Sequence, residues 1–577
     1  MRRGDNPQMR GAFRTGVLAL WCAGLPITVL TTGWSVTADV PTPKVTAMPA
    51  GSRGAADHDY PFFSTDIVLA NYGYVEEEFG FEGTANTYAA PGTNGSIEIA
   101  QHDIPYRTRL IVRRPARQAR FNGVVLVEWF NVTNQYDTDV LWLYQKEFLI
   151  REGYAWVGVS AQNVGLSAPT TGLKAWSPKR YGQLDVTNKG AISGDGLAAD
   201  IYSQAAAAIR RVAAVLGGLT PAYLIAAGQS QSAGRLGPYL NGPHHRSPIY
   251  DAALLTVNNQ AIRPDITIPV IKVLSETERE SARRQPDLDR VRVWPVTGAT
   301  HSEQYSLLSR AAFLKRDLGR QAVDACATPA RSRVEIRYVY NAATNALVTW
   351  LRTGGAAPRA PMFVYDETAP EKPLKRDDHG NALGGIRTAE IAVPVAKESA
   401  ELCGLGGTHL PFETATLNTL YPSHAGYVAK VTKASQDLVA AGFLLPADAA
   451  QTIDKAQRSI YGSRLVCGPL CADVRQFPSH PSSMLLANQT AYLMIKDGDA
   501  LVKILDGVTR AIAEGDTLGT DRRATQKYAS AAAGLRRYIS AVRASGAKGN
   551  MPPETEALLV DQAHVLIERV SSYMMPR

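Results

Sequence analysis

Tyr223-Leu-Ile-Ala-Ala-Gly-Gln-Ser-Gln-Ser-Ala-Gly-Arg235 is the stretch from which the fold can be predicted. Its first residues are apolar and indicate a short buried strand, and the residues from 235 to 240 are expected to continue as a helix. A strand, a sharp turn with serine at its apex and an immediate helix form a nucleophile elbow. Such a turn exposes a serine hydroxyl to a base, while the first N–H groups of the helix point at the group under attack.

The serine at the apex can be chosen from the spacing. The usual elbow is Gly-x-Ser-x-Gly, whereas here Gly228 is followed by Ser230, and Ser232 stands in the place of the second glycine. That position requires a small residue, so we expect Ser230 to be the nucleophile. In the other register Ser232 would be the nucleophile, but no glycine would then directly follow the strand. An ordinary turn rich in small polar residues is the competing structural interpretation.

The chain has 577 residues, 45% of them hydrophobic, which is enough for more than one domain. Residues 1–38 are typical of a signal peptide, because four arginines precede an apolar run at 17–30 and Val36-Thr37-Ala38 fits a cleavage site. We therefore expect a secreted or periplasmic protein that keeps no membrane span after the signal is removed.

The charge balance is mildly basic. The formal net charge is +8, and residues 1–38 hold four arginines and one aspartate, so their removal leaves +8 − 3 = +5. No basic run with interleaved aromatic residues is present, so the sequence does not predict a nucleic-acid partner.

Four cysteines follow the predicted signal: Cys326, Cys403, Cys467 and Cys471. An even number in an exported chain suggests two disulfides, for which three pairings exist. Cys467 and Cys471 could close a small loop, which would leave Cys326 with Cys403. Zinc binding is the competing interpretation, but Cys-x3-Cys without a second nearby pair is poor zinc spacing.

Apolar runs alternate with helical patterns along the chain. Strands are predicted at 104–115, 124–130, 154–160, 223–227, 251–257, 269–274 and 291–296, and helices at 141–151, 198–216, 235–240 and 341–352. This alternation predicts an α/β fold with a mostly parallel sheet covered by helices on both faces. Active sites in such sheets lie at the carboxyl ends of the strands.

A serine nucleophile requires a histidine base, and the histidine requires an acid that fixes its orientation. His301 follows the strand at 291–296, and Glu278 follows the strand at 269–274, three positions after the small residue Ser275. The chain order Ser, acid, His is that of the α/β-hydrolases. Glu278 is the expected acid and Glu276 the second choice. A solvated glutamate and a surface histidine are the competing interpretations, and only their joint position favours a triad.

An oxyanion hole completes the expected site. One donor should be the backbone N–H of Gln231, directly after the nucleophile, and the other should come from Phe130 or Asn131 in the loop after the strand at 124–130. No metal or organic cofactor is required by this chemistry. The glycine clusters at 384–385 and 404–407 lack the Lys-Ser/Thr of a phosphate-binding loop, so nucleotide binding is not predicted.

These motifs resemble the exported bacterial proteins described as alpha/beta hydrolase domain proteins. The matching residues are 74–78, 83–85, 127–131, 228–233, 275–278, 298–301, 376–387 and 420–422, so the resemblance covers roughly residues 60 to 460. It implies an α/β-hydrolase fold and serine hydrolase activity, with little information about the substrate. The family's elbow also has serine in place of the last glycine.

Three parts of the chain are predicted. Residues 1–38 are the signal peptide, 57–475 the α/β-hydrolase domain with a cap or extension at 353–470, and 484–577 a helical C-terminal domain. In the last part, Leu501, Leu505, Val508 and Ile512 repeat at helical spacing, with Gly515 as the expected stop. Together with 520–545 and 554–574, this run predicts a small antiparallel bundle.

The sequence thus predicts a serine hydrolase that cleaves carboxylic esters through an acyl-serine intermediate, acting on a small-molecule or lipid-like ester. An amidase or peptidase with the same triad is one alternative. A non-catalytic envelope-binding protein on a hydrolase fold is another. The physiological ester and the oligomeric state are not predicted.

Overall fold

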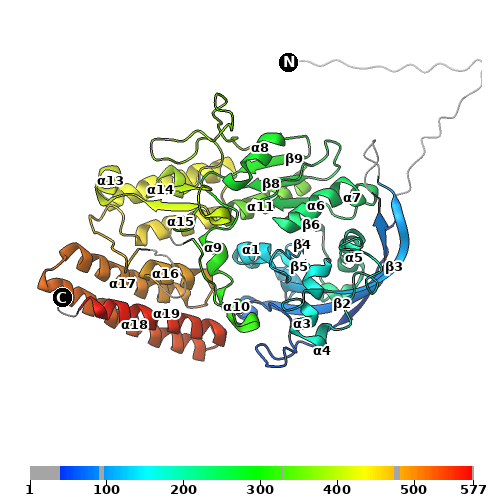
Figure 1. Cartoon of the computed structure of the whole chain (residues 1–577), viewed down its shortest axis with the longest axis horizontal. Coiled ribbons are helices and arrows are strands. Elements are labelled where there is room, and N and C mark those ends of the chain that lie inside the picture. The colour runs from blue at the N-terminus through cyan, green and yellow to red at the C-terminus, as the bar shows by residue number, and fades with distance from the viewer. Residues whose placement is uncertain (1–38, 90–96, 327–328, 473–480, 575–577) are drawn as a thin grey trace, which may run out of the picture. The chain divides into compact units, whose positions relative to one another are not determined.

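A computed structural model describes residues 39–89, 97–326, 329–472 and 481–574 (Figure 1). The predicted signal peptide therefore lies outside the described residues. Residues 39–577 form one compact unit, and the proposed division into domains at 475 and 484 stays a prediction.

The described residues contain a nine-stranded sheet in the order β1-β2-β3-β5-β4-β6-β7-β8-β9. Strands β4 to β9 pair in parallel with their neighbours, and β1, β2 and β3 add an antiparallel edge. The strands are β1 Lys44–Ala47, β2 Tyr74–Tyr88, β3 Ile99–Pro115, β4 Val124–Trp129, β5 Ala155–Val159, β6 Tyr223–Gln229, β7 Ala252–Thr256, β8 Val270–Leu274 and β9 Val291–Pro295. The predicted α/β class is confirmed.

Helices cover the parallel strands, and every residue of β4, β5, β7, β8 and β9 is buried. This burial explains why these strands are mostly apolar, with Glu128, Lys272 and Arg292 as buried charged exceptions. Helices α1 (Val140–Arg151) and α11 (Arg337–Thr353) pack against each other and against the sheet, and α6 (Gln231–Asn241) packs on β4, β6 and β7. Helix α5 (Ala198–Arg211) contacts the β2 edge. Shorter helices in this part are α2 Asn163–Ser167, α3 Leu173–Trp176, α4 Pro178–Tyr181, α7 Pro243–Arg246, α8 Arg279–Arg284, α9 Gln304–Leu308 and α10 Ala311–Leu318.

The extension after α11 is a mixed region. It contains a two-stranded sheet, β10 Ala396–Ser399 with β11 Thr408–Pro411, and the helices α12 Ala389–Ala392, α13 Thr414–Leu420, α14 His424–Ala441 and α15 Pro446–Arg458. Ile386 pairs in parallel with Val296, directly after β9. The extension therefore continues the main sheet beyond its last strand.

Four helices end the described chain: α16 Ser483–Tyr492, α17 Gly498–Leu518, α18 Arg522–Ala547 and α19 Pro553–Ser572 (orange to red in Figure 1). The prediction that Gly515 ends a helix is wrong, because α17 continues through it to Leu518. A Cβ at Gly515 would lie 2.7 Å from the ring of Tyr528 on α18, so the glycine permits close helix packing. Arg316 of α10 binds Glu554 of α19 at 2.8 Å, so these helices dock on the sheet-containing part.

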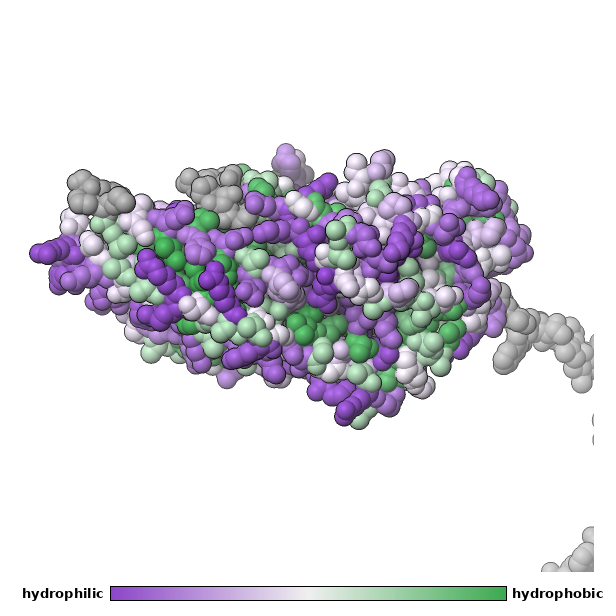
Figure 2. Space-filling view, turned by 90° about the horizontal axis from the view of Figure 1, so that it is seen from below, coloured by the Kyte–Doolittle hydropathy of each residue, from purple (hydrophilic) through white to green (hydrophobic). Residues whose placement is uncertain are grey.

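The cysteines are paired as Cys326–Cys403 and Cys467–Cys471, which confirms the predicted disulfides. Among the helices of the described residues, none has the length and apolar content needed to cross a bilayer. On the face shown in Figure 2, hydrophilic residues surround separate hydrophobic patches.

Candidate active site

The turn at Ser230 has the strained geometry of an elbow. Strand β6 ends at Gln229, α6 begins at Gln231, and Ser230 between them has φ 57° and ψ −116°. A positive φ is uncommon for a residue with a side chain and persists only where the surroundings enforce it. Here the Ser230 N–H donates to the Thr256 carbonyl at 3.0 Å, and the Gly234 N–H donates to the Ser230 carbonyl at 2.9 Å.

The residues on either side of Ser230 explain the pattern of this turn. A Cβ at Gly228 would lie 2.9 Å from the backbone nitrogen of Ala233, so the strand and the helix approach too closely for any larger residue. Ser232 is fully buried, and its hydroxyl donates to the Gln229 carbonyl and accepts from the Gln229 N–H, both at 3.0 Å. Ser232 therefore closes the turn, and its hydroxyl is not presented to a substrate.

The three candidate triad residues lie in one hydrogen-bonded row. His301 Nε2 lies 2.6 Å from Ser230 Oγ, and His301 Nδ1 lies 2.6 Å from Glu278 Oε1. The Ser230 and His301 side chains are partly exposed, whereas Glu278 is 3% exposed. A carboxylate on Nδ1 leaves Nε2 free to accept the serine proton, which is the arrangement that activates a serine.

Local sequence holds Glu278 in place. Ser275 caps the short helical turn at 276–278: its hydroxyl accepts from the Thr277 N–H at 3.2 Å and donates to Glu278 Oε2 at 2.6 Å. The Ser275 N–H reaches the same oxygen at 3.2 Å. These bonds leave Glu278 Oε1 to face His301.

Glu276, the second choice for the acid, points elsewhere. Its carboxylate accepts from the Gly298 N–H at 2.7 Å and from the Ala400 N–H at 3.3 Å, with Arg376 at 3.5 Å. Burial raises its pKa above the usual value, and the charge of Arg376 opposes this rise. Glu276 thus links the loop that carries His301 to the extension.

The backbone N–H groups expected to form the oxyanion hole differ in whether they already have a hydrogen-bond acceptor. Gln231 is the first residue of α6, so its N–H has no acceptor within the helix. The Phe130 N–H, by contrast, donates to the Val159 carbonyl at 3.3 Å, and the Asn131 N–H donates to Thr138 at 3.1 Å. The prediction that the Phe130 N–H is available for the oxyanion is wrong, because the β4–β5 hydrogen bonding continues one residue past the end of β4. The next amide, at Val132, donates to the side-chain oxygen of Gln231 at 3.2 Å.

Buried ion pairs anchor the loop after β4. Arg109 of β3 binds Glu78 of β2 at 2.6 Å and Asp137 of the loop at 3.1 Å, and all three side chains are at most 1% exposed. Asp139 pairs with Arg113 of β3 in the same way. Removing one partner of such a pair leaves a buried charge uncompensated, so the pairs fix where this loop lies relative to Ser230.

A polar network that the sequence did not reveal borders Ser230. Gln162 follows β5 and exchanges hydrogen bonds with the Gln231 side chain at 2.6 and 3.2 Å. Its side-chain oxygen also lies 3.3 Å from Arg235 Nε, and Arg235 pairs with Asp195 at 2.9 Å. The only sequence signal for Gln162 is its place at the carboxyl end of a strand.

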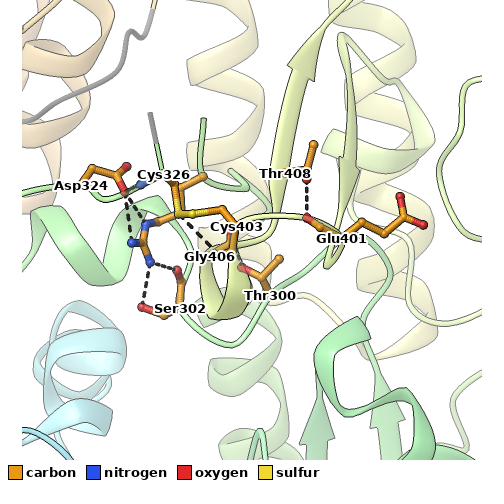
Figure 3. Close-up of a disulfide and its surroundings, with 9 residues drawn as sticks. Thr300, Ser302, Asp324, Cys326, Glu401, Cys403, Gly406 and Thr408 are labelled. Carbon is orange, nitrogen blue, oxygen red and sulfur yellow. Dashed lines mark hydrogen bonds and ion pairs between the residues drawn. A yellow bond between two sulfur atoms is a disulfide. The ribbon is translucent and has the colours of Figure 1, made fainter. Parts of the chain in front are cut away.

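The extension braces the loop of His301. Ser302 N–H donates to the Leu405 carbonyl at 2.9 Å, and the Thr300 hydroxyl donates to the Gly406 carbonyl at 3.2 Å. The Cys326–Cys403 disulfide ties this segment down, and Thr300 and Gly406 lie beside it (Figure 3). The part of the chain from 400 to 407 therefore acts as a strap over the residues next to His301.

The cavities among the described residues include two that are large enough for a small molecule. One, of about 600 Å³, is lined by residues of α15, α16 and α17 and includes no triad residue. The other, of about 880 Å³, is lined by residues that include Trp129, Asp195, Gly234 and Arg235 near the elbow, and it likewise includes no triad residue.

The chain was compared with known proteins. A family model described as alpha/beta hydrolase domain matches residues 40–454. No curated protein matches the chain. Solved structures with similarity include esterases from Rhizomucor miehei, at 11% identity over 49% of this chain and 85% of that chain, with a TM-score of 0.26. A cold-adapted esterase from an Arctic intertidal metagenomic library is 13% identical over 42% of this chain and 91% of that chain, with a TM-score of 0.23. Family membership rests on the family model, and these likenesses carry no argument about the substrate.

Proposed function

The chain belongs to the alpha/beta hydrolase domain family, and we propose that it is a serine hydrolase that cleaves carboxylic esters through an acyl-serine intermediate. The observation that carries this proposal is the row Ser230, His301, Glu278, with two contacts of 2.6 Å. Cysteine, metal or cofactor chemistry is not needed for such a reaction.

In the proposed first half-reaction, Ser230 Oγ bonds to the carbonyl carbon of the ester while His301 Nε2 takes its proton. Glu278 accepts the Nδ1–H bond and stabilises the imidazolium. The tetrahedral intermediate then breaks its bond to the alcohol oxygen, which receives the proton from His301. A water molecule, deprotonated by His301, attacks the acyl-serine, and the acid leaves as Ser230 regains its proton.

We assign the oxyanion hole to the N–H groups of Gln231 and Val132. The Val132 N–H is directed to a rotatable side chain, that of Gln231, whereas the Phe130 N–H is committed to a backbone carbonyl in the sheet. A substrate oxygen can displace a side-chain acceptor more easily than it can break a strand pairing. Such donors contribute about 3 kcal/mol each to transition-state stabilisation.

We infer that the protein acts outside the cytoplasm. The basic and apolar pattern of residues 1–38 and the two disulfides support this inference, since disulfides persist in oxidising compartments.

The proposal is tested by turnover of paired substrates on the purified protein. We expect p-nitrophenyl acetate to be hydrolysed, and acetyl p-nitroanilide to be hydrolysed at least about 100-fold more slowly, because an amide is the harder bond to cleave without dedicated leaving-group assistance. Comparable rates on both would favour the amidase alternative. Absence of turnover of either, with no reaction toward a fluorophosphonate, would favour a non-catalytic binding protein.

A further inference from the structure

The cavity of about 600 Å³ lies between the extension and the C-terminal helices. Its lining includes residues of α12 and α15 in the extension and of α16 and α17 in the C-terminal part, and α15, α16 and α17 lie next to one another in Figure 1. No triad residue lines it, so the proposed reaction does not account for this space. Its volume is in the range of pockets that enclose small-molecule ligands.

One carboxyl group in the lining of this cavity has no cation bound to it. Glu390 of α12 is partly exposed and lines the cavity. Among the described residues, no lysine, arginine or histidine forms an ion pair with Glu390. Lys455, whose charge acts on Glu390, is bonded to Glu335 at 2.9 Å, and Arg337 binds the same Glu335 at 2.9 Å. Both of these cations are therefore already held by another acid.

The charges around Glu390 do not balance. Lys455 and Arg337 carry two positive charges, and the acids bonded to them, Glu335 and Glu147, carry two negative charges. The charge of Glu390 is left over. Burial raises the pKa of Glu390 above its usual value, and the nearby charge of Glu335 adds to this rise. A cation bound beside Glu390 would offset both effects.

Aromatic rings border the same part of the cavity. Tyr427 and Tyr461 both line it, with their ring centroids 5.4 Å apart, and the charge of Glu390 acts on Tyr427. The face of an aromatic ring attracts cations, and rings of this kind commonly surround bound ammonium groups. Together with the carboxyl group of Glu390, these tyrosines favour a cationic ligand.

Apolar side chains line the cavity on its other side. Met484 and Ala487 of α16 and Val502 of α17 belong to this wall. Asp506 of α17 also lines the cavity, but it is paired with Arg458 at 3.4 Å. An apolar chain that enters this space leaves water and gains contacts with aliphatic side chains.

We propose that this cavity binds an organic ammonium ion with an apolar chain, the ammonium group at Glu390 and the chain along α16 and α17. A metal ion fits the lining less well, because the part of the chain that the structure describes contains no group of three or more metal-ligating side chains. The site is separate from Ser230, and the proposal does not depend on the hydrolase function.

The ligand class is tested by isothermal titration calorimetry with six-carbon compounds that differ in their end group. Hexylammonium should bind at least about tenfold more tightly than hexanol or hexanoate, because a hydrogen bond between two charged groups supplies a factor of that size. Absence of hexylammonium binding, or equal or tighter binding of hexanol or hexanoate, would overturn the proposal.

Two carboxylate variants locate the ammonium group. Glu390→Gln should weaken hexylammonium binding at least about tenfold. Asp499→Asn removes the same charge from an exposed residue of α17 that also lines the cavity, and it should weaken binding less than about twofold, since solvent and salt screen an exposed charge. Equal losses in the two folded variants would mean that the ammonium group does not lie at Glu390, which contradicts the proposal.

A second pair of variants keeps the test decisive if Glu390→Gln does not fold. Ala487→Trp places a ring in the apolar part of the cavity and should abolish hexylammonium binding, whereas Ala529→Trp, at an exposed position of α18 outside the lining, should retain it. Urea unfolding verifies that each variant is folded. Undiminished binding by folded Ala487→Trp would overturn the proposal.

Turnover of p-nitrophenyl acetate by the same samples tests the hydrolase function separately. A protein that binds hexylammonium through Glu390 but hydrolyses no ester supports the ammonium site and contradicts only the hydrolase function. A protein that hydrolyses the ester but does not bind hexylammonium contradicts only the ammonium site.

Discussion

His301 Nε2 lies 2.6 Å from Ser230 Oγ, although 71 residues separate the two in the chain. Their loops follow β9 and β6, which are three places apart in the sheet, with β7 and β8 between them. The parallel sheet brings both loops to the same edge, so two residues far apart in the chain come within hydrogen-bonding distance, as the proposed nucleophile and base require.

The acid is tested by two matched variants. Glu278→Gln should lower kcat about 10³-fold or more, because an amide cannot hold the correct His301 tautomer and stabilise the imidazolium. Glu276→Gln removes a charge of the same size only two residues away and should lower kcat less than about tenfold, since Glu276 bonds to Gly298 and Ala400 instead of His301. Steady-state hydrolysis of p-nitrophenyl acetate measures both, and a larger loss at Glu276 would reverse the assignment.

Ser232 provides a test of the elbow itself. Ser232→Ala leaves the buried Gln229 N–H without its acceptor and should lower the free energy of unfolding by about 1–3 kcal/mol. Fluorophosphonate should still label Ser230, because the Ser232 hydroxyl takes no part in the attack. Urea unfolding and labelling on the same sample check both statements; loss of labelling in a protein of unchanged stability would make Ser232 the nucleophile.

The strap predicts a link between the Cys326–Cys403 disulfide and activity. Replacing both cysteines by serine opens a loop of sequence separation 77 and should cost about 4 kcal/mol in free energy of unfolding. It should also lower kcat, because the strap that bonds to Thr300 and Ser302 loses its anchor. Cys467→Ser/Cys471→Ser, which opens a loop of separation 4 far from His301 in the chain, is the control. Equal kcat values in the two double variants would show that the strap does not position His301.

Glu303 gives a prediction for pH. It is fully buried two residues after His301, and burial raises its pKa to about 7, although the Tyr144 hydroxyl donates to it at 2.7 Å. Between the ordinary value of 4.5 and about 7, the unfolded chain ionises at this residue while the folded protein stays protonated. The stability contribution of Glu303 is therefore complete below pH 4.5 and is lost as the pH rises to 7.

Glu303→Gln should remove the loss of stability that the ionisation of Glu303 causes as the pH rises. The free energy of unfolding should fall from pH 5 to pH 8 by up to about 3 kcal/mol more in the wild type than in the variant. Urea unfolding at the two pH values gives both differences. A fall of the same size in the two proteins would mean that Glu303 is ionised in the folded state.

Local sequence was sufficient for the parts of the site that lie directly at strand ends. The apolar β6, the glycine at 228 and the small Ser275 before Glu278 each reflect a steric or capping requirement that operates within a few residues. The α/β class followed for the same reason, because alternating strands and helices are visible in the apolar pattern.

Hydrogen bonds and ion pairs between distant segments could not be predicted from local sequence patterns. The partner of the Phe130 N–H depends on how far the β4–β5 ladder extends, and that is decided by two segments packing together. The burial of Arg109 against Glu78 depends on the register of β2 with β3. The pairing of Cys326 with Cys403 could be predicted, but the hydrogen bonds of the strap to Thr300 and Ser302 join segments far apart in the chain, and no local pattern determines them.

The most direct test is mass spectrometry of the protein after reaction with a fluorophosphonate. An activated serine forms a covalent phosphonyl ester, whereas an ordinary serine hydroxyl does not react. We predict one adduct, on the peptide that contains Ser230, and none in Ser230→Ala or His301→Ala. No adduct on the folded wild-type protein, or an adduct that persists in Ser230→Ala, would contradict the account.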